Sequence, residues 1–264
     1  MKFTDLNIGK PLNNALIDLG LDTPTPIQSE SFSPVMAGKD VVGIAQTGTG
    51  KTFAYLLPIL RGLKYSEQKH PRVLILVPTR ELVVQLAEEI NKLTAYMTVR
   101  VKAVYGGTNI NTQKQDVHEG SDIVVATPGR LLDLALSGVL RLKKVQQIVI
   151  DEVDEMLDLG FRTQLINLFD ILPQRRQNLM FSATMTEDVE EIIGQFFFEP
   201  EKIEIAPSGS TVDHIEQFAY HLPNFNTKFN LLDHLILEDK LGTKNLIFVE
   251  TKKLADSLYE RSNY

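Results

Sequence analysis

The clearest chemical pattern in the sequence is a glycine-rich loop at positions 45–52. It follows an apolar run and precedes a segment with helical apolar spacing, so we expect a strand, a tight turn and a helix in succession. Gly48 and Gly50 would let backbone N–H groups turn toward an anion, and the helix N-terminus would add positive potential. Lys51 would then reach the β- and γ-phosphates of a nucleotide, and the Thr52 hydroxyl would hold Mg²⁺. The residues predicted to bind the triphosphate are Ala45, Gln46, Thr47, Gly48, Thr49, Gly50, Lys51 and Thr52.

Two adjacent acidic residues, Asp151 and Glu152, could complete this chemistry. They directly follow a strand-like run at 147–150, and a magnesium–nucleotide site needs a carboxylate at the end of a neighbouring strand. We expect Asp151 to hold Mg²⁺ and Glu152 to accept a proton from the attacking water, with Lys51 as the third catalytic residue. A strand followed by acidic residues is also an ordinary helix start, since carboxylates suit helix N-termini. The predicted phosphate loop favours the magnesium site.

These residues lie in a chain whose dominant pattern is short β-branched runs alternating with longer helical stretches. The stretch at 80–93, for example, repeats apolar residues at three- and four-residue steps. The runs themselves are almost continuously apolar, which is typical of strands buried on both faces of a parallel sheet. We therefore predict an α/β fold with a mostly parallel sheet, helices on both faces, and ligands at the carboxyl ends of the strands. The runs occupy residues 40–45, 72–77, 99–105, 121–127, 146–150 and 178–184.

A change in composition divides the chain into two parts. Residues 1–207 are predicted to form the complete α/β domain, and the polar, aperiodic stretch at 208–212 is predicted to be a linker. Residues 213–264 are expected to begin a second α/β domain that stops before its sheet is closed. The elements predicted there are a strand at 215–222, a helix at 228–239, a strand at 244–251 and a helix from Lys252.

Composition excludes several other classes of protein. The 264 residues are 43% hydrophobic, which is enough for a packed core and excludes a disordered chain. The absence of cysteine excludes disulfide scaffolds, thiolate zinc sites and a cysteine nucleophile. The first residues lack a secretory signal, and no apolar run reaches the roughly 20 residues that span a bilayer, so we expect a soluble, cytoplasmic protein without membrane contact. A net charge of −7 argues against a broadly basic nucleic-acid binder but leaves room for a local binding edge.

With the two motifs placed, the sequence resembles the DEAD-box family of ATP-dependent RNA helicases over nearly the whole first part. The segment at 20–28 is similar to the adenine-reading motif of that family. The resemblance implies that Phe3, Thr23 and Gln28 bind the adenine of ATP, with a donor and an acceptor from the carboxamide of Gln28 and a stacking face from Phe3. By itself, a Pro-Thr-Pro turn before a helix is an ordinary loop. The resemblance also implies a RecA-like P-loop NTPase domain with ATP and Mg²⁺ as cofactors.

Three further segments resemble the motifs that line the RNA backbone in this family. All three follow strand-like runs, so a parallel sheet would present them along one edge. Backbone N–H groups, threonine hydroxyls and arginines can grip phosphates without reading bases, which implies RNA binding independent of base sequence. Each motif taken alone could equally be a turn with a surface arginine, but their order favours RNA. The residues implied are Pro78, Thr79, Arg80, Gly106, Gly107, Thr127, Pro128, Gly129 and Arg130.

A Ser-Ala-Thr segment resembles the family motif that links hydrolysis to strand separation. The resemblance implies hydrogen bonds from Ser182 and Thr184 to Asp154, while the same hydroxyls could also cap the following helix. Ala45 replaces the glycine that opens the usual phosphate-loop pattern. Three positions depart from the family pattern: Val153 replaces the alanine of the acidic motif, Leu21 stands where an aromatic residue is common, and Glu250 where asparagine is common. We expect Val153 to alter packing rather than chemistry, because it is neither a metal ligand nor a base.

The resemblance favours ATP-dependent RNA remodelling, in which ATP and RNA bind together and domain closure bends one strand so that a short duplex separates. Residues 246–251 resemble motif IV of the second domain, and the sequence ends at Tyr264, before motifs V and VI. We therefore expect these residues alone to bind ATP but hydrolyse it weakly, because the arginines that reach the γ-phosphate are missing. Two alternatives stay open: an ATP-gated RNA clamp that does not unwind, and a DNA-dependent ATPase of the wider helicase superfamily.

Overall fold

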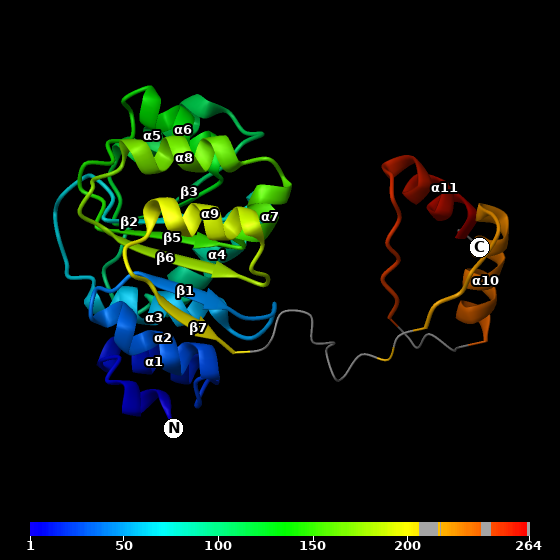
Figure 1. Cartoon of the computed structure of the whole chain (residues 1–264), viewed down its shortest axis with the longest axis horizontal. Helices are drawn as coiled ribbons and strands as arrows, with labels where there is room; N and C mark the ends of the chain where they lie inside the picture. Colours follow the sequence, from blue (N-terminus) through cyan, green and yellow to red (C-terminus); the bar gives the residue numbers. More distant parts are fainter. Residues whose placement is uncertain (206–215, 217, 239–243, 263–264) are drawn as a thin grey trace. The chain divides into compact units, whose positions relative to one another are not determined.

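The computed structural model describes residues 1–205, 216, 218–238 and 244–262. The chain divides into two compact units, Met1–Ser210 and Thr211–Tyr264 (Figure 1). The linker predicted at 208–212 lies outside the described residues, so the domain boundaries drawn from the sequence stay predictions.

The first unit is built on one seven-stranded sheet in which all neighbouring strands are parallel, in the order β3-β4-β2-β5-β6-β1-β7. The predicted α/β fold is confirmed, because all six apolar runs form strands. The seventh strand was not predicted; it lies at the edge and buries only Ile203. The strands are β1 (Val41–Ile44), β2 (Val73–Leu76), β3 (Val101–Val104), β4 (Ile123–Ala126), β5 (Gln147–Asp151), β6 (Gln177–Ser182) and β7 (Glu201–Glu204).

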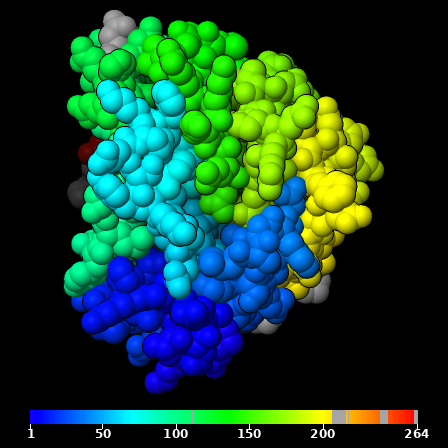
Figure 2. Space-filling view, turned by 90° about the vertical axis from the view of Figure 1, so that its left-hand side faces the viewer, coloured from blue at the N-terminus to red at the C-terminus, as the bar shows by residue number. Residues whose placement is uncertain are grey.

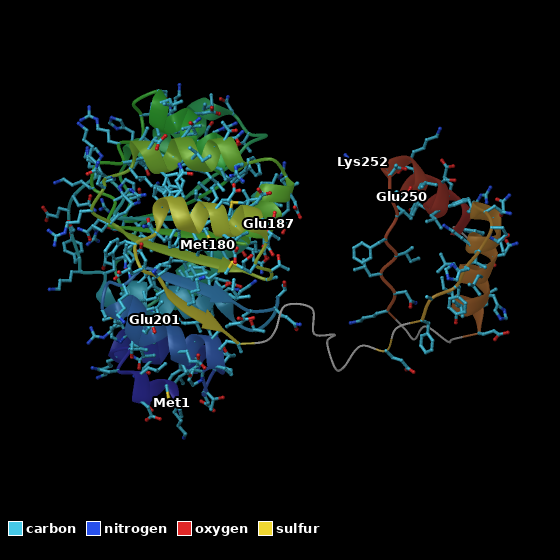
Figure 3. The ribbon with its side chains drawn as sticks, viewed as in Figure 1. Met1, Met180, Glu187, Glu201, Glu250 and Lys252 are labelled. Carbon is cyan, nitrogen blue, oxygen red and sulfur yellow. The ribbon has the colours of Figure 1, made fainter. Side chains whose placement is uncertain are left out.

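Two layers of helices cover the sheet. Helices α1 to α4 pack on one face of the sheet and α5 to α9 on the other. Successive side chains of a strand point to opposite faces, so Val41 packs in the hydrophobic core under α1 to α4 and Val42 in the second core, under α5 to α9. Met180 of β6 is fully buried in the second core (Figure 3). The helices of this unit are a 3-10 turn (Phe3–Leu6), α1 (Lys10–Asp18), α2 (Pro26–Met36), α3 (Lys51–Gly62), α4 (Arg80–Leu93), α5 (Ile110–His118), α6 (Pro128–Leu136), α7 (Val153–Asp158), α8 (Arg162–Ile171) and α9 (Glu187–Phe196).

The strand order sorts the predicted motifs into two groups. The segments that resemble RNA-binding motifs follow β2, β3 and β4, which are three neighbouring strands. The phosphate loop, the acidic pair and the Ser-Ala-Thr segment follow β1, β5 and β6, which are the next three. Because every strand is parallel, all six motifs lie at the carboxyl edge of the sheet, where open α/β sheets bind ligands.

The second unit contains two helices among its described residues, α10 (Phe225–Leu237) and α11 (Lys252–Ser262). Both helices were predicted, and α10 begins earlier than expected because the Asn224 side chain caps it, accepting a hydrogen bond from Thr227 N at 3.0 Å. The two predicted strands are not formed in the described residues 216, 218–222 and 244–251, so that prediction is wrong there. A strand needs a neighbour for its N–H and C=O groups, and here even Phe248 is 85% exposed.

Candidate functional site

The glycine-rich loop has the backbone geometry that its sequence predicts. Gly48 and Gly50 have positive φ angles of 85° and 90°, and α3 begins at the next residue, Lys51. The Thr49 hydroxyl donates a hydrogen bond to the carbonyl of Gln46 at 2.7 Å, which closes the turn. Because conformations with positive φ are accessible mainly to glycine, these two positions account for the glycines of the motif.

Alanine at position 45 is compatible with this loop. Ala45 has no positive φ angle, and its N–H donates to the carbonyl of Ser182 at 3.1 Å, continuing the β1–β6 pairing by one residue. Its side chain is buried. The position therefore requires no glycine, and the departure from the usual pattern does not alter the loop.

The phosphate loop and Glu152 line one cleft, and Asp151 lines a smaller cavity with Thr52 and Glu152. A cleft of about 250 Å³ is bordered by Thr47, Lys51, Glu152 and Thr184, among others. Among the residues that the structure describes, neither Lys51 Nζ nor Asp151 Oδ1 has a hydrogen-bond partner, although both atoms are buried. Buried polar groups in proteins are normally paired. An unpaired ammonium group and an unpaired carboxylate oxygen, in two cavities that Glu152 also lines, fit a phosphate and a metal ion.

The two acidic residues differ in environment. Asp151 ends β5, is 8% exposed, and accepts a hydrogen bond from the Tyr55 hydroxyl at 2.8 Å through Oδ2. Burial raises the pKa of Asp151, although the Tyr55 hydrogen bond and the charge of Lys51 oppose the rise. Glu152 lies in the left-handed region with φ 57° and ψ 49°, a sparsely populated conformation for a non-glycine residue. Burial, a hydrogen bond with Glu155 and the Asp151 charge raise the pKa of Glu152 to about 7.

The predicted link between Asp154 and the segment after β6 is present for one of its two residues. Thr184 donates to Asp154 Oδ2 twice, from its N–H at 3.0 Å and from its hydroxyl at 2.8 Å. Burial raises the pKa of Asp154, but the interactions with Thr184 and Ser182 outweigh it and the net pKa is lowered. The Ser182 hydroxyl is fully buried and has no hydrogen-bond partner in the described part of the chain. Ser182 nevertheless contributes to lowering the pKa of Asp154, so the expected bond from Ser182 stays a prediction.

The segment predicted to read adenine contacts the phosphate loop directly. Gln28 donates from Nε2 to the carbonyl of Gly50 at 3.1 Å and accepts from Thr25 N at 3.0 Å through Oε1. Phe3 is only 4% exposed and packs in the core, so the structure offers no open face for stacking. Thr23 is exposed. Adenine binding by these residues stays a prediction, and the Gln28 amide is already engaged with the loop.

The three segments that resemble RNA-binding motifs meet at the β3-β4-β2 side of the edge. A side-chain carbon added at Gly107, whose φ is +82°, would lie 3.5 Å from Nη1 of Arg80. Arg130 donates to Oε1 of Gln113 at 3.0 Å and to the carbonyl of Thr108 at 3.2 Å. The start of α6 is thereby tied to the loop after β3. The predicted residues are brought together although they come from three separate stretches of sequence.

These predicted contact residues differ in exposure. Arg80 and Gly107 are exposed, while Pro78, Thr127 and Pro128 are buried and shape the starts of α4 and α6. Thr79 caps α4 and accepts a hydrogen bond from Leu82 N at 3.3 Å. Gly106, Gly129 and Arg130 are partly exposed.

Sequence reasoning missed Tyr55, because it lies in an apolar helical stretch that reads as core. Its hydroxyl nevertheless reaches the predicted metal ligand Asp151. The pKa of Tyr55 is raised well above its usual value by burial and by the neighbouring carboxylate, so the hydroxyl keeps its proton. Its position three residues after Thr52 on one helix was the available signal, since residues spaced in this way share a helix face.

A parallel α/β sheet, a phosphate loop between β1 and α3 and an acidic pair at the end of β5 define a RecA-like P-loop domain. The family model described as DEAD/DEAH box helicase matches residues 25–192. The chain therefore belongs to the DEAD/DEAH box helicase family.

Curated relatives agree with this assignment. The ATP-dependent RNA helicase DeaD of Escherichia coli K12 is 40% identical over 267 residues, covering 99% of this chain and 42% of the relative. RhlB of Shewanella piezotolerans is 37% identical, covering 98% and 60%, and RhpA of Helicobacter pylori is 36% identical, covering 98% and 52%. The chain thus spans between two fifths and three fifths of the length of these relatives. None of the helices in the described residues is both long and apolar enough to cross a membrane.

Proposed function

We propose that this chain is the ATP-binding part of an ATP-dependent RNA helicase, and that its carboxyl edge holds ATP–Mg²⁺ beside an RNA strand. The observation that supports this most strongly is the pair of buried, open atoms, Lys51 Nζ and Asp151 Oδ1, which have no protein partner in the described part of the chain. Leaving a charge buried and unpaired is costly, so both atoms are expected to gain a partner from a ligand.

On this proposal, the nucleotide binds where the phosphate loop meets the end of β5. The backbone amides of the loop and Lys51 bind the phosphates, and Thr52 and Asp151 hold Mg²⁺. The metal, when bound, would neutralise charge that develops on the transferring phosphoryl group. Glu152 orients the attacking water and accepts its proton. Gln28 connects the adenine end to the phosphates through its hydrogen bond to the carbonyl of Gly50.

The RNA strand is proposed to lie along the neighbouring side of the same edge, over the ends of β2, β3 and β4. Arg80 and Arg130, together with the glycine turns between them, present donors that suit phosphates rather than base edges. Binding independent of base sequence follows from this. The double hydrogen bond between Thr184 and Asp154 joins the segments after β5 and β6. We propose that it transmits the state of the nucleotide to the RNA edge.

The relatives that share this chain's sequence are named ATP-dependent RNA helicases. Because the chain spans only part of their length, RNA unwinding is proposed for the whole protein and not for these residues alone.

The proposal is tested by ATP turnover of the full-length protein with and without single-stranded RNA. We expect RNA to stimulate turnover, and DNA of the same sequence to stimulate it less, because 2′-hydroxyl contacts distinguish the two. Arg80→Ala should raise the RNA concentration for half-maximal stimulation about tenfold, the effect of losing one charge-assisted hydrogen bond. Arg175→Ala is the matched control, since this exposed arginine lies at the opposite edge of the sheet. Equal stimulation by RNA and DNA would contradict the RNA assignment.

A further inference from the structure

A tyrosine hydroxyl contacts the proposed magnesium ligand from inside the protein. Tyr55 OH donates a hydrogen bond of 2.8 Å to Oδ2 of Asp151, joining α3 to the end of β5. Tyr55 has no exposed surface and Asp151 is 8% exposed, so water does not compete for this bond. A hydrogen bond from a neutral donor to a buried carboxylate is stronger than one between neutral groups.

The ring of Tyr55 is fixed by its surroundings. It packs against Phe181 of β6, with ring centroids 5.2 Å apart at 50°. Phe181 in turn lies over Gly43 of β1 so closely that a side-chain carbon there would be 2.6 Å from the Phe181 ring. The hydroxyl of Tyr55 therefore has a fixed position, set by three elements of the fold.

The two carboxylate oxygens of Asp151 have different surroundings because of this hydrogen bond. Oδ2 is taken by Tyr55, while Oδ1 has no hydrogen-bond partner among the described residues. Tyr55 also lies on the helix that carries Lys51 and Thr52, and residues three and four positions apart share a helix face. One helix thus supplies the phosphate-binding lysine, the metal-binding hydroxyl and the donor that contacts the carboxylate.

We propose that Tyr55 is a positioning residue: its hydroxyl orients the Asp151 carboxylate so that Oδ1 is the oxygen left to hold Mg²⁺. This rests on the proposed function of the site. Groups that hydrogen-bond a metal ligand fix its orientation, and removing one typically lowers metal affinity 10- to 100-fold. The hydroxyl itself touches neither nucleotide nor metal in this scheme.

The test is Tyr55→Phe, which keeps the ring packing and removes only the hydroxyl. Affinity for a fluorescent ATP analogue is measured in excess EDTA and across a Mg²⁺ titration. We expect the Mg²⁺ concentration for half-maximal enhancement of binding to rise about tenfold. Affinity in EDTA should stay at the wild-type value, because the phosphate loop is untouched.

Tyr96→Phe is the matched control. It removes another tyrosine–aspartate hydrogen bond, of 2.6 Å to Asp18, on the exposed surface. Its Mg²⁺ dependence should equal that of the wild type. Replacement of Tyr55 by 4-aminophenylalanine, which retains a donor at the same place, should restore much of the Mg²⁺ response and serves as a second variant if Tyr55→Phe folds poorly.

The outcomes separate this inference from the function on which it rests. If the wild type binds the analogue in a Mg²⁺-dependent way and Tyr55→Phe shows the same Mg²⁺ dependence, the positioning role is wrong and the nucleotide site stands. Equal weakening of binding with and without Mg²⁺ would also overturn it, because that is the signature of a purely structural residue. If the wild type binds no nucleotide, the proposed function and this inference fail together.

Discussion

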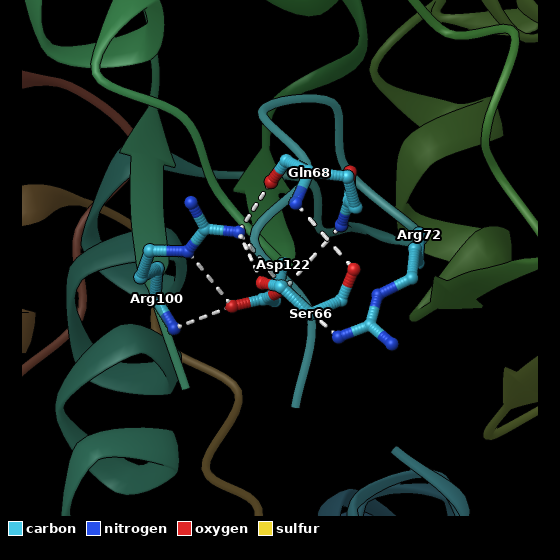
Figure 4. Close-up of polar contacts among 5 residues, drawn as sticks. All are labelled: Ser66, Gln68, Arg72, Arg100 and Asp122. Carbon is cyan, nitrogen blue, oxygen red and sulfur yellow. Dashed lines mark hydrogen bonds and ion pairs between the residues drawn. The ribbon is translucent and has the colours of Figure 1, made fainter. Parts of the chain in front are cut away.

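Two aspartates are buried at strand ends on opposite edges of the same sheet, and they are paired in very different ways. Asp122, just before β4, is 3% exposed and accepts hydrogen bonds from Arg72 at 2.8 Å and from Arg100 Nε and N at 3.0 Å each (Figure 4). Within the described part of the chain, Asp151, at the end of β5, accepts one side-chain hydrogen bond, from Tyr55. A saturated buried carboxylate can hold a fold together, whereas a half-satisfied one is available to a ligand.

The carboxylate of Asp122 is held from several sides, although Arg72 Nε and Gln68 Oε1 beside it have no hydrogen-bond partner among the described residues. Arg100 also donates to the carbonyls of Ser66 and Gln68, so the loop before β2 is tied to the start of β3. Figure 2 faces this amino edge, where segments of the cyan, green and yellow-green parts of the chain lie against one another. Hydrogen bonds from Gln146 N to the Arg72 carbonyl and from Gln177 N to the Gln146 carbonyl, both 2.8 Å, join them. At the amino edge both carboxylate oxygens of Asp122 are paired with arginines, whereas at the carboxyl edge Asp151 Oδ1 has no partner among the described residues.

The largest expected effect is on stability at the amino edge. Asp122→Asn should lower the free energy of unfolding by about 3 kcal/mol, because Arg72 and Arg100 would lose the carboxylate that neutralises them. Their side chains are only 12% and 33% exposed, so water replaces the lost partner poorly. Urea unfolding measures the change. Nucleotide affinity of the folded variant should match the wild type, and a loss of affinity would mean that the two edges are coupled.

The same substitution at the other edge should act in the opposite direction. Asp151→Asn, measured in EDTA, should leave the free energy of unfolding unchanged or raise it by about 1 kcal/mol, because it removes a buried charge that lacks full pairing. Mg²⁺-dependent nucleotide binding should be lost in this variant. A destabilisation as large as that of Asp122→Asn would contradict the conclusion that Asp122 stabilises the fold and Asp151 does not.

Acid should weaken the amino edge selectively. Burial of Asp122 opposes ionisation, but hydrogen bonds from Arg100 and Arg72 outweigh it and hold the pKa below its usual value of 3.8. A lowered folded-state pKa means that the stabilisation is complete above the unfolded-state value and is lost as pH falls through the folded-state value. The stability advantage of the wild type over Asp122→Asn should therefore be constant from pH 7 to pH 5 and shrink below about pH 4. Urea unfolding at several pH values measures this, and a constant advantage down to pH 2 would contradict it.

The smallest effect is expected for an exposed ion pair. Lys102 Nζ lies 2.6 Å from Glu119 Oε2, and the Glu119 side chain is 71% exposed. Glu119→Gln should leave the urea midpoint unchanged, because solvent screens such pairs and their net contribution is small. A shift comparable with that of Asp122→Asn would show that burial is not what separates strong from weak pairs in this protein.

Local sequence patterns predicted most of the secondary structure and the phosphate loop. They did not predict which residues far apart in the sequence pair with one another. The phosphate loop, six strands and the helices between them follow from apolar spacing and glycine positions within short windows. The partners of Asp122 and Asp151 do not, since Arg100 is 22 residues away and Tyr55 is 96 residues away. Only the strand order places them together, and parallel strands can be ordered in many ways with the same sequence pattern.

Strand prediction from the sequence failed for the same reason, because it depends on which strand lies next to which. Strand β7 was missed because its residues, Glu201–Glu204, are mostly charged and exposed, which suits an edge strand but gives no apolar run. The opposite error occurred in the second unit, where the run at 244–251 predicted a strand that is not formed in the described residues. Apolar character favours a strand, but a partner strand has to be available.

The central claim is that the phosphate loop and the acidic pair form one ATP–Mg²⁺ site. Calorimetric titration of ATP into the wild type, Lys51→Ala and Asp151→Asn, each with Mg²⁺ and with EDTA, tests it most directly. We predict that Mg²⁺ strengthens binding to the wild type, that Lys51→Ala weakens binding in both conditions, and that Asp151→Asn loses only the Mg²⁺-dependent part. ATP binding that is unaffected by either substitution, or no binding to the wild type, would contradict the claim.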